Sequence, residues 1–63
     1  MAVEKSTRLE NKRSGKLVYV VSIFVTQDEK TNWETMNCYY VRSVIGGKTQ
    51  YIYEFELNKW SVK

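Results

Sequence analysis

Two adjacent glycines, Gly46 and Gly47, separate two runs of β-branched and aromatic residues within residues 36–57. A Gly-Gly pair between such runs is typical of a two-residue β-hairpin, because a type I′ turn needs positive φ at both central positions. With the turn centred on this pair, one face of the hairpin carries five directly opposed pairs: Met36 with Leu57, Cys38 with Phe55, Tyr40 with Tyr53, Arg42 with Tyr51 and Val44 with Thr49. Directly opposed residues share a face of a sheet. The pattern therefore predicts an antiparallel hairpin with one face almost wholly apolar or aromatic.

Residues 17–26, LVYVVSIFVT, are the clearest further strand, because β-branched and aromatic side chains dominate them. Both faces of this run are largely apolar, as in a strand that is buried on both sides. Pairing Tyr19 with Arg42 and Val25 with Met36 places its odd-numbered residues on the apolar face of the hairpin. The predicted fold is all-β, a three-stranded antiparallel meander with strands at about 17–26, 35–45 and 48–58.

The N-terminal residues differ from the rest of the chain in charge. Residues 1–16 are polar and hold five basic residues against two acidic ones, a net charge of 5 − 2 = +3, whereas residues 17–63 carry no net charge. We therefore expect a basic N-terminal arm over 1–16 and a single small β domain over 17–63. A short helix is possible within the arm, with Thr7 as its N-cap and Glu10 three residues later in a capping box.

The apolar face of the predicted meander needs a cover. It would contain Leu17, Tyr19, Val21, Ile23, Val25, Met36, Cys38, Tyr40, Val44, Tyr51, Tyr53, Phe55 and Leu57. A sheet buries such a face only against a second layer, and this chain has no amphipathic helix that could provide one. The sheet could curl into a small partial barrel, two copies could stack as a homodimer, or another protein could cover the face. We expect the homodimer, with the partial barrel as the alternative.

The residue types argue against an enzyme. The chain has no histidine and a single cysteine, so the usual pairs of nucleophile and base, and the usual clusters of metal ligands, are missing. Residues 46–49 read GGKT but lack the upstream glycine spacing of a phosphate-binding loop. We expect no catalytic activity, no cofactor and no metal.

The expected location is the cytoplasm of the producing or host cell. No apolar run reaches the length of a membrane span, and the charged first residues do not resemble a signal peptide. Cys38 fits a small buried apolar residue in a reducing compartment.

Binding to a larger protein is the preferred function. A very small chain with two partly apolar sheet faces suits a homodimer that docks onto a partner as an inhibitor or adaptor, of the kind that viruses and mobile elements encode. Large aromatic side chains dominate the energetics of such interfaces. The expected anchors are Phe24, Trp33, Tyr39 and Trp60.

Nucleic-acid binding is the alternative function. Aromatic side chains on a sheet can stack on bases, and neighbouring cations can hold phosphates. The residues that would do so are Lys12, Arg13, Lys16, Tyr40, Arg42, Lys48, Tyr51 and Tyr53. Salt should weaken such binding steeply, whereas binding to a protein through aromatic anchors should depend less on salt.

Overall fold

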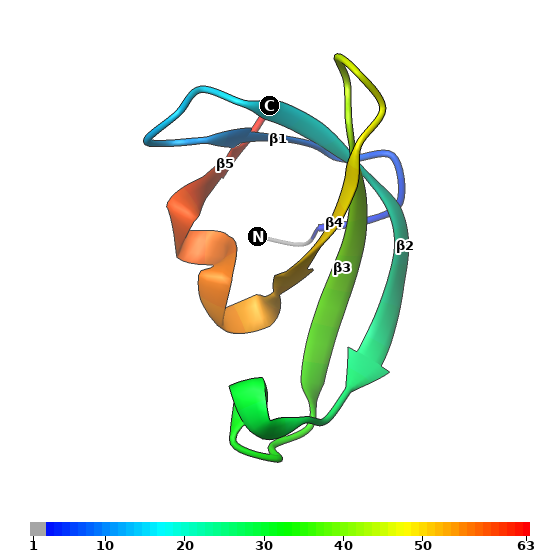
Figure 1. Ribbon diagram of the computed structural model, residues 1–63, viewed down its shortest axis with the longest axis vertical. Helices are drawn as coiled ribbons and strands as arrows, with labels where there is room; N and C mark the ends of the chain where they lie inside the picture. Colours follow the sequence, from blue (N-terminus) through cyan, green and yellow to red (C-terminus); the bar gives the residue numbers. More distant parts are fainter. Residues whose placement is uncertain (1–2) are drawn as a thin grey trace.

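The computed structural model describes residues 3–63, apart from the side chain of Thr31, and confirms an all-β fold. The described residues form five strands and two short 3₁₀ helices: β1 (Arg8–Asn11), β2 (Leu17–Thr26), η1 (Glu29–Thr31), β3 (Met36–Ser43), β4 (Thr49–Tyr53), η2 (Glu54–Lys59) and β5 (Trp60–Val62). They make one open antiparallel sheet in the order β4-β3-β2-β1-β5. The three predicted strands are therefore the correct kind of structure but too few. Figure 1 shows that the sheet bends strongly, with β1 and β5 facing back toward β3 and β4.

The first additional strand lies where an arm or a short helix was expected. β1 pairs with β2 on one side and with β5 on the other, and its Leu9 is only 1% exposed. The helix predicted from Thr7 does not form, because pairing on both sides satisfies the backbone groups of β1 and buries its one apolar residue. A four-residue strand with a single apolar side chain leaves almost no periodic signal in the sequence.

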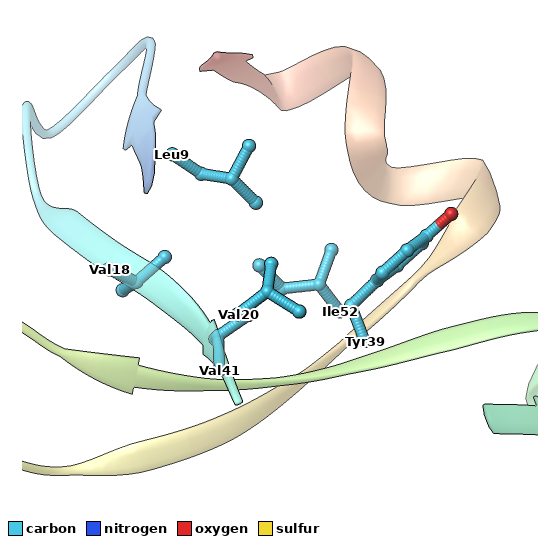
Figure 2. Close-up of a cluster of buried hydrophobic side chains, with 6 residues drawn as sticks. All are labelled: Leu9, Val18, Val20, Tyr39, Val41 and Ile52. Carbon is cyan, nitrogen blue, oxygen red and sulfur yellow. The ribbon is translucent and has the colours of Figure 1, made fainter. Parts of the chain in front are cut away.

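The hydrophobic core lies on the face of the sheet opposite to the one predicted. Its buried members belong to β1, β2, β3 and β4 and are drawn in Figure 2: Leu9, Val18, Val20, Tyr39, Val41 and Ile52. Leu57 of η2 and Trp60 of β5 pack against this cluster. Several residues of the predicted core face are instead exposed: Leu17, Val21, Val25, Val44, Tyr51 and Phe55. Both faces of β2 and β3 are apolar, so the pattern alone could not show which one β1, η2 and β5 would cover.

An irregularity in β2 changes which of its side chains face the core. The register shifts between Val20 and Ser22, a β-bulge that leaves Val21 unpaired. Before it, Tyr19 lies opposite Arg42 as predicted, but beyond it the pairing is displaced by one residue, so that Phe24 lies opposite Cys38. A bulge inserts one extra residue and reverses the alternation that follows. The predicted pairing of Val25 with Met36 is therefore wrong, and Phe24 moves to the outer face.

The predicted hairpin forms with a longer turn. Residues 44–48 connect the strands, and Gly46 and Gly47 both have positive φ, 89° and 69°, as the sequence predicted. The backbone N–H of Ser43 donates to the carbonyl of Lys48, and the Ser43 hydroxyl donates to the carbonyl of Ile45 at 2.6 Å, which stabilises this five-residue connection. Tyr40 consequently lies opposite Tyr51 rather than Tyr53, a shift of two residues that preserves the faces.

The third predicted strand ends earlier than expected. β4 stops at Tyr53, and residues 54–59 form η2, which begins with the backbone N–H of Tyr53 donating to a carboxylate oxygen of Glu56 at 3.3 Å. The other carboxylate of this turn, that of Glu54, accepts a hydrogen bond from the backbone N–H of Asn37. η2 thus carries the chain away from β3 and brings Leu57 onto the core. None of the helices in the described part of the chain is long and apolar enough to span a membrane.

Candidate binding surface

Five aromatic side chains gather on and beside the outer side of β2, β3 and β4, the side away from the core. We call this group the aromatic face: Phe24, Tyr40, Tyr51, Tyr53 and Phe55. The ring of Phe24 meets that of Tyr51 edge-on at 5.8 Å, and the rings of Tyr40 and Tyr51 lie 5.1 Å apart. Tyr53 and Phe55 form a second pair at 5.6 Å. These separations are typical of favourable aromatic pairs, so the rings support one another in place.

The aromatic face is accessible. Phe24 is 41% exposed, Tyr51 is 58% exposed and Phe55 is 53% exposed. Aromatic side chains scattered singly on a surface need no explanation, but a contiguous group of them marks an interaction site. The aromatic face is therefore the main candidate site of this protein.

A polar contact ties Tyr53 to the loop between β2 and β3. Its hydroxyl donates a hydrogen bond of 2.6 Å to a carboxylate oxygen of Asp28. This bond, followed by partial desolvation and the negative charge of Asp28, raises the pKa of Tyr53 to about 12. The ammonium of Lys30 lies 6.0 Å from the centre of the same ring, within the range of a weak cation–π contact. These contacts hold one border of the aromatic face in a defined position.

Two hollows lie along the aromatic face. The larger, of about 720 Å³, runs beside β4 and η2 and is lined by Lys30, Gln50, Tyr51, Tyr53, Phe55 and Glu56. The smaller, of about 220 Å³, is lined by Phe24, Thr26, Cys38, Tyr51 and Tyr53. The surface is thus concave beside β4, which suits a partner that inserts a side chain or an extended segment.

The four residues predicted to anchor a protein partner do not lie together. Phe24 belongs to the aromatic face, and Trp33 is 62% exposed in the loop after η1. Tyr39 is buried in the core, because beyond the bulge Ile23 of β2 lies opposite it on the covered face, and it is not available to a partner. Trp60 is half-buried against the core and lines a separate apolar hollow of about 340 Å³ with Leu9 and Leu57.

The residues predicted to bind nucleic acid fall into two groups. Tyr40, Arg42, Tyr51 and Tyr53 all lie on β3 or β4 at positions that share the outer side. Lys12, Arg13 and Lys16 lie in the β1–β2 turn, and Lys48 lies in the β3–β4 turn. These two turns lie at one end of the molecule and the β2–β3 connection at the other (Figure 1). The backbone N–H of Val44 donates to the carbonyl of Leu17 at 3.1 Å, so the β1–β2 turn and the β3–β4 turn lie next to each other where they meet the sheet.

The sequence predicts Phe55 on the core face and does not indicate the contacts that Asp28 and Lys30 make with Tyr53. Phe55 reaches the surface because β4 ends at Tyr53 and η2 begins at Glu54. No proline or glycine in the sequence marks this change. Asp28 and Lys30 lie in a polar loop whose contact with Tyr53 spans 25 residues. Only the tertiary structure brings such distant groups together.

Within residues 3–63, the side chains described form no group of three or more cysteine or carboxylate ligands that could hold a metal ion. Comparison of the chain with family models, curated proteins and solved structures finds no match. Its function is therefore argued from the geometry of its surface.

Proposed function

We propose that this protein is a small non-enzymatic module that binds a larger protein through the aromatic face. The observation that supports this most is the exposure of Tyr51 and Phe55 at a hollow of about 720 Å³, with the exposed ring of Phe24 against Tyr51. Burying aromatic rings of this kind supplies much of the free energy of protein association. A role as an inhibitor or adaptor in the cytoplasm of the producing or host cell is consistent with this mode of action.

Charge favours a protein partner over nucleic acid at the aromatic face itself. The carboxylates of Asp28 and Glu56 border it, and both are close enough to Cys38 to act on the pKa of its thiol. Fixed negative charges beside a stacking platform repel phosphates. A protein surface can carry both basic groups that pair with Asp28 and Glu56 and an acidic group that pairs with Lys30.

The docking function is tested by replacing exposed rings. Phe24→Ser with Tyr51→Ser should abolish binding to a partner that the wild-type protein captures from its host, and calorimetry with that purified partner should show the same loss. Val25→Ser is the matched control, because Val25 is 64% exposed on the same strand but lies outside the aromatic face. A partner that binds the double variant as tightly as the wild type contradicts the proposal.

A second candidate function, nucleic-acid binding, is favoured by one specific observation. The turn over residues 12–16 holds three cations and no acid, and it adjoins the turn that holds Lys48. Substituting Lys12, Arg13 and Lys16 with Ala should then weaken binding to a single-stranded oligonucleotide, with a reduced salt dependence. Binding that is absent at low salt would remove this candidate and leave the docking function untouched.

A further inference from the structure

The outer edge of β4 has backbone groups that point away from the sheet. β4 is the end strand in the order β4-β3-β2-β1-β5. Because the N–H of Ser43 bonds the carbonyl of Lys48, the backbone groups of residues 48, 50 and 52 face β3 in an antiparallel ladder. Those of Thr49, Tyr51 and Tyr53 face outward. The N–H of Tyr53 already donates to Glu56, which closes the ladder at that end.

This edge lacks the usual protection against pairing. Natural edge strands are guarded by prolines, bulges or charged side chains within the strand. β4 reads TQYIY and has none of these, while a hollow runs alongside it. Charges occur only just outside the strand, as Lys48 before it and Glu54 after it, at the first residue of η2. Both side chains are exposed, and one carboxylate oxygen of Glu54 accepts the N–H of Asn37, which leaves the other oxygen for a cation.

The positions of these two charges define a self-complementary register. If two copies of β4 pair antiparallel with Tyr51 opposite Tyr51 of the second copy, Lys48 of each copy lies opposite Glu54 of the other. Opposite charges across a strand pair stabilise it. The N–H groups of Tyr51 and Thr49 would donate to the carbonyls of Tyr51 and Tyr53 of the other copy, and the N–H of Tyr53 could stay with Glu56.

Neighbouring registers are less favourable. Moving the two-fold axis to Gln50 places Lys48 opposite Ile52 of the other copy, so that neither Lys48 nor Glu54 faces an opposite charge across the strand pair. Moving the axis to Ile52 requires the N–H of Tyr53, which is already bonded to Glu56. Only the Tyr51-centred register combines free backbone donors with two pairs of opposite charges.

We propose that a second copy of this chain binds along β4 in the Tyr51-centred antiparallel register, joining the two sheets into one. The exposed Tyr51 rings then meet across the two-fold axis and make the two aromatic faces continuous. The paired segment is short, so the interface lies at the small end of specific interfaces and the dimer should be weak. The proposal does not rest on the docking function, since it needs no third protein.

Charge reversal tests the proposal directly. Lys48→Glu alone and Glu54→Lys alone each replace two opposite-charge pairs with two like-charge pairs, so each variant should raise the dimer dissociation constant about tenfold or more, as measured by sedimentation equilibrium. An equimolar mixture of the two variants should dimerise as the wild type does, because the charges are then complementary again. Circular dichroism checks that each variant is folded, and recovery in the mixture excludes misfolding as the cause.

The register has its own test. In a Cys38→Ala background, Tyr51→Cys places two thiols opposite each other at a Cα separation of about 5.5 Å, which a disulfide spans. The matched control Thr49→Cys places its two thiols four residues apart along the pair, about 14 Å, beyond disulfide reach. Mild oxidation should link the first variant and not the second.

Three results would overturn the proposal. The wild type could remain monomeric at millimolar concentration, the mixture of charge variants could fail to recover dimers, or Thr49→Cys could cross-link as readily as Tyr51→Cys. A monomer that still binds a larger protein through Phe24 and Tyr51 would refute the dimer alone. A dimer with no docking partner would refute the docking function alone.

Discussion

Tyr53 illustrates how much a single side chain connects in this small protein. It is the last residue of β4 and the N-cap of η2. Its ring belongs to the aromatic face, and its hydroxyl donates a hydrogen bond to Asp28 in the β2–β3 loop. Because the bond needs the phenol proton, it favours the protonated form of Tyr53. The ionisation of Tyr53 therefore shows whether the β2–β3 loop is bonded to the end of β4.

The titration of Tyr53 is the first prediction. A pKa of about 12, against about 10 for an unperturbed tyrosine, means that the folded protein holds this proton more tightly than the unfolded chain. The hydrogen bond from Tyr53 to Asp28 therefore stabilises the folded state fully below pH 10, and this stabilisation is lost as the pH rises through 12. Ultraviolet titration should show a late ionisation step that belongs to Tyr53. Tyr53→Phe should remove this late step, whereas the control Tyr51→Phe should leave it in place.

Cys38 supports a second prediction at this scale. The thiol is 2% exposed, and burial, followed by the charges of Asp28 and Glu56, raises its pKa. The reactive thiolate is therefore scarce as well as shielded. Labelling by a disulfide reagent at pH 8 should be at least about tenfold slower in the native protein than in denaturant. Equal rates would mean that the outer side of β3 opens readily.

At the scale of elements, β1 determines how the core is closed. It lies between β2 and β5, and without it β5 would have no neighbour in the sheet. Its Leu9 points from β1 toward the other buried side chains (Figure 2). β1 is thus an integral part of the fold, although its sequence is polar and the net charge of residues 1–16 predicted a basic arm.

Leu9→Ala tests the role of β1. Truncation of a fully buried leucine costs about 2–5 kcal/mol, which is most of the stability expected for a domain of this size. The matched control is Arg8→Ala, since Arg8 is exposed on the same strand and should change stability by about 0.5 kcal/mol or less. Chemical denaturation measures both. A small effect of Leu9→Ala would indicate that β1 is not part of the cooperative core.

The bulge in β2 is the second decisive element. By turning Phe24 outward and Ile23 toward Tyr39, it supplies the aromatic face with one ring and the core with one side chain. A strand of ten residues without the bulge would put Phe24 on the other face. One unpaired residue, Val21, therefore helps to build both the core and the candidate site.

At the scale of the whole molecule, the two ends of the chain complete a single unit. β1 and β5 pair with each other, and the N–H of Lys63 bonds the carbonyl of Arg8 at 2.8 Å. Lys63 and Glu10 also form an ion pair of 2.8 Å, which is exposed and contributes little. Contacts between segments about fifty residues apart make folding depend on both ends at once.

A truncated chain tests this dependence. Residues 17–63, which the sequence predicts as a single small β domain, should fail to unfold cooperatively, because their core loses Leu9 and their β5 loses its neighbour. Near-ultraviolet circular dichroism and thermal melting would measure the loss. The 63-residue chain carrying Lys12→Ala and Lys16→Ala is the control, since both side chains are exposed and removing their charge should leave the cooperative transition intact.

Local sequence patterns were sufficient for the strand type, the position of β2 and the positive φ of Gly46 and Gly47, because these depend on steric preferences of neighbouring residues. They also brought Tyr40, Arg42, Tyr51 and Tyr53 to one face, since a shift of two residues preserves sides. Only the tertiary structure decided which face is buried, because both are apolar and the cover comes from Leu9, Leu57 and Trp60, residues distant in the chain. The aromatic residues that a local pattern assigned to the core are on the surface for that reason.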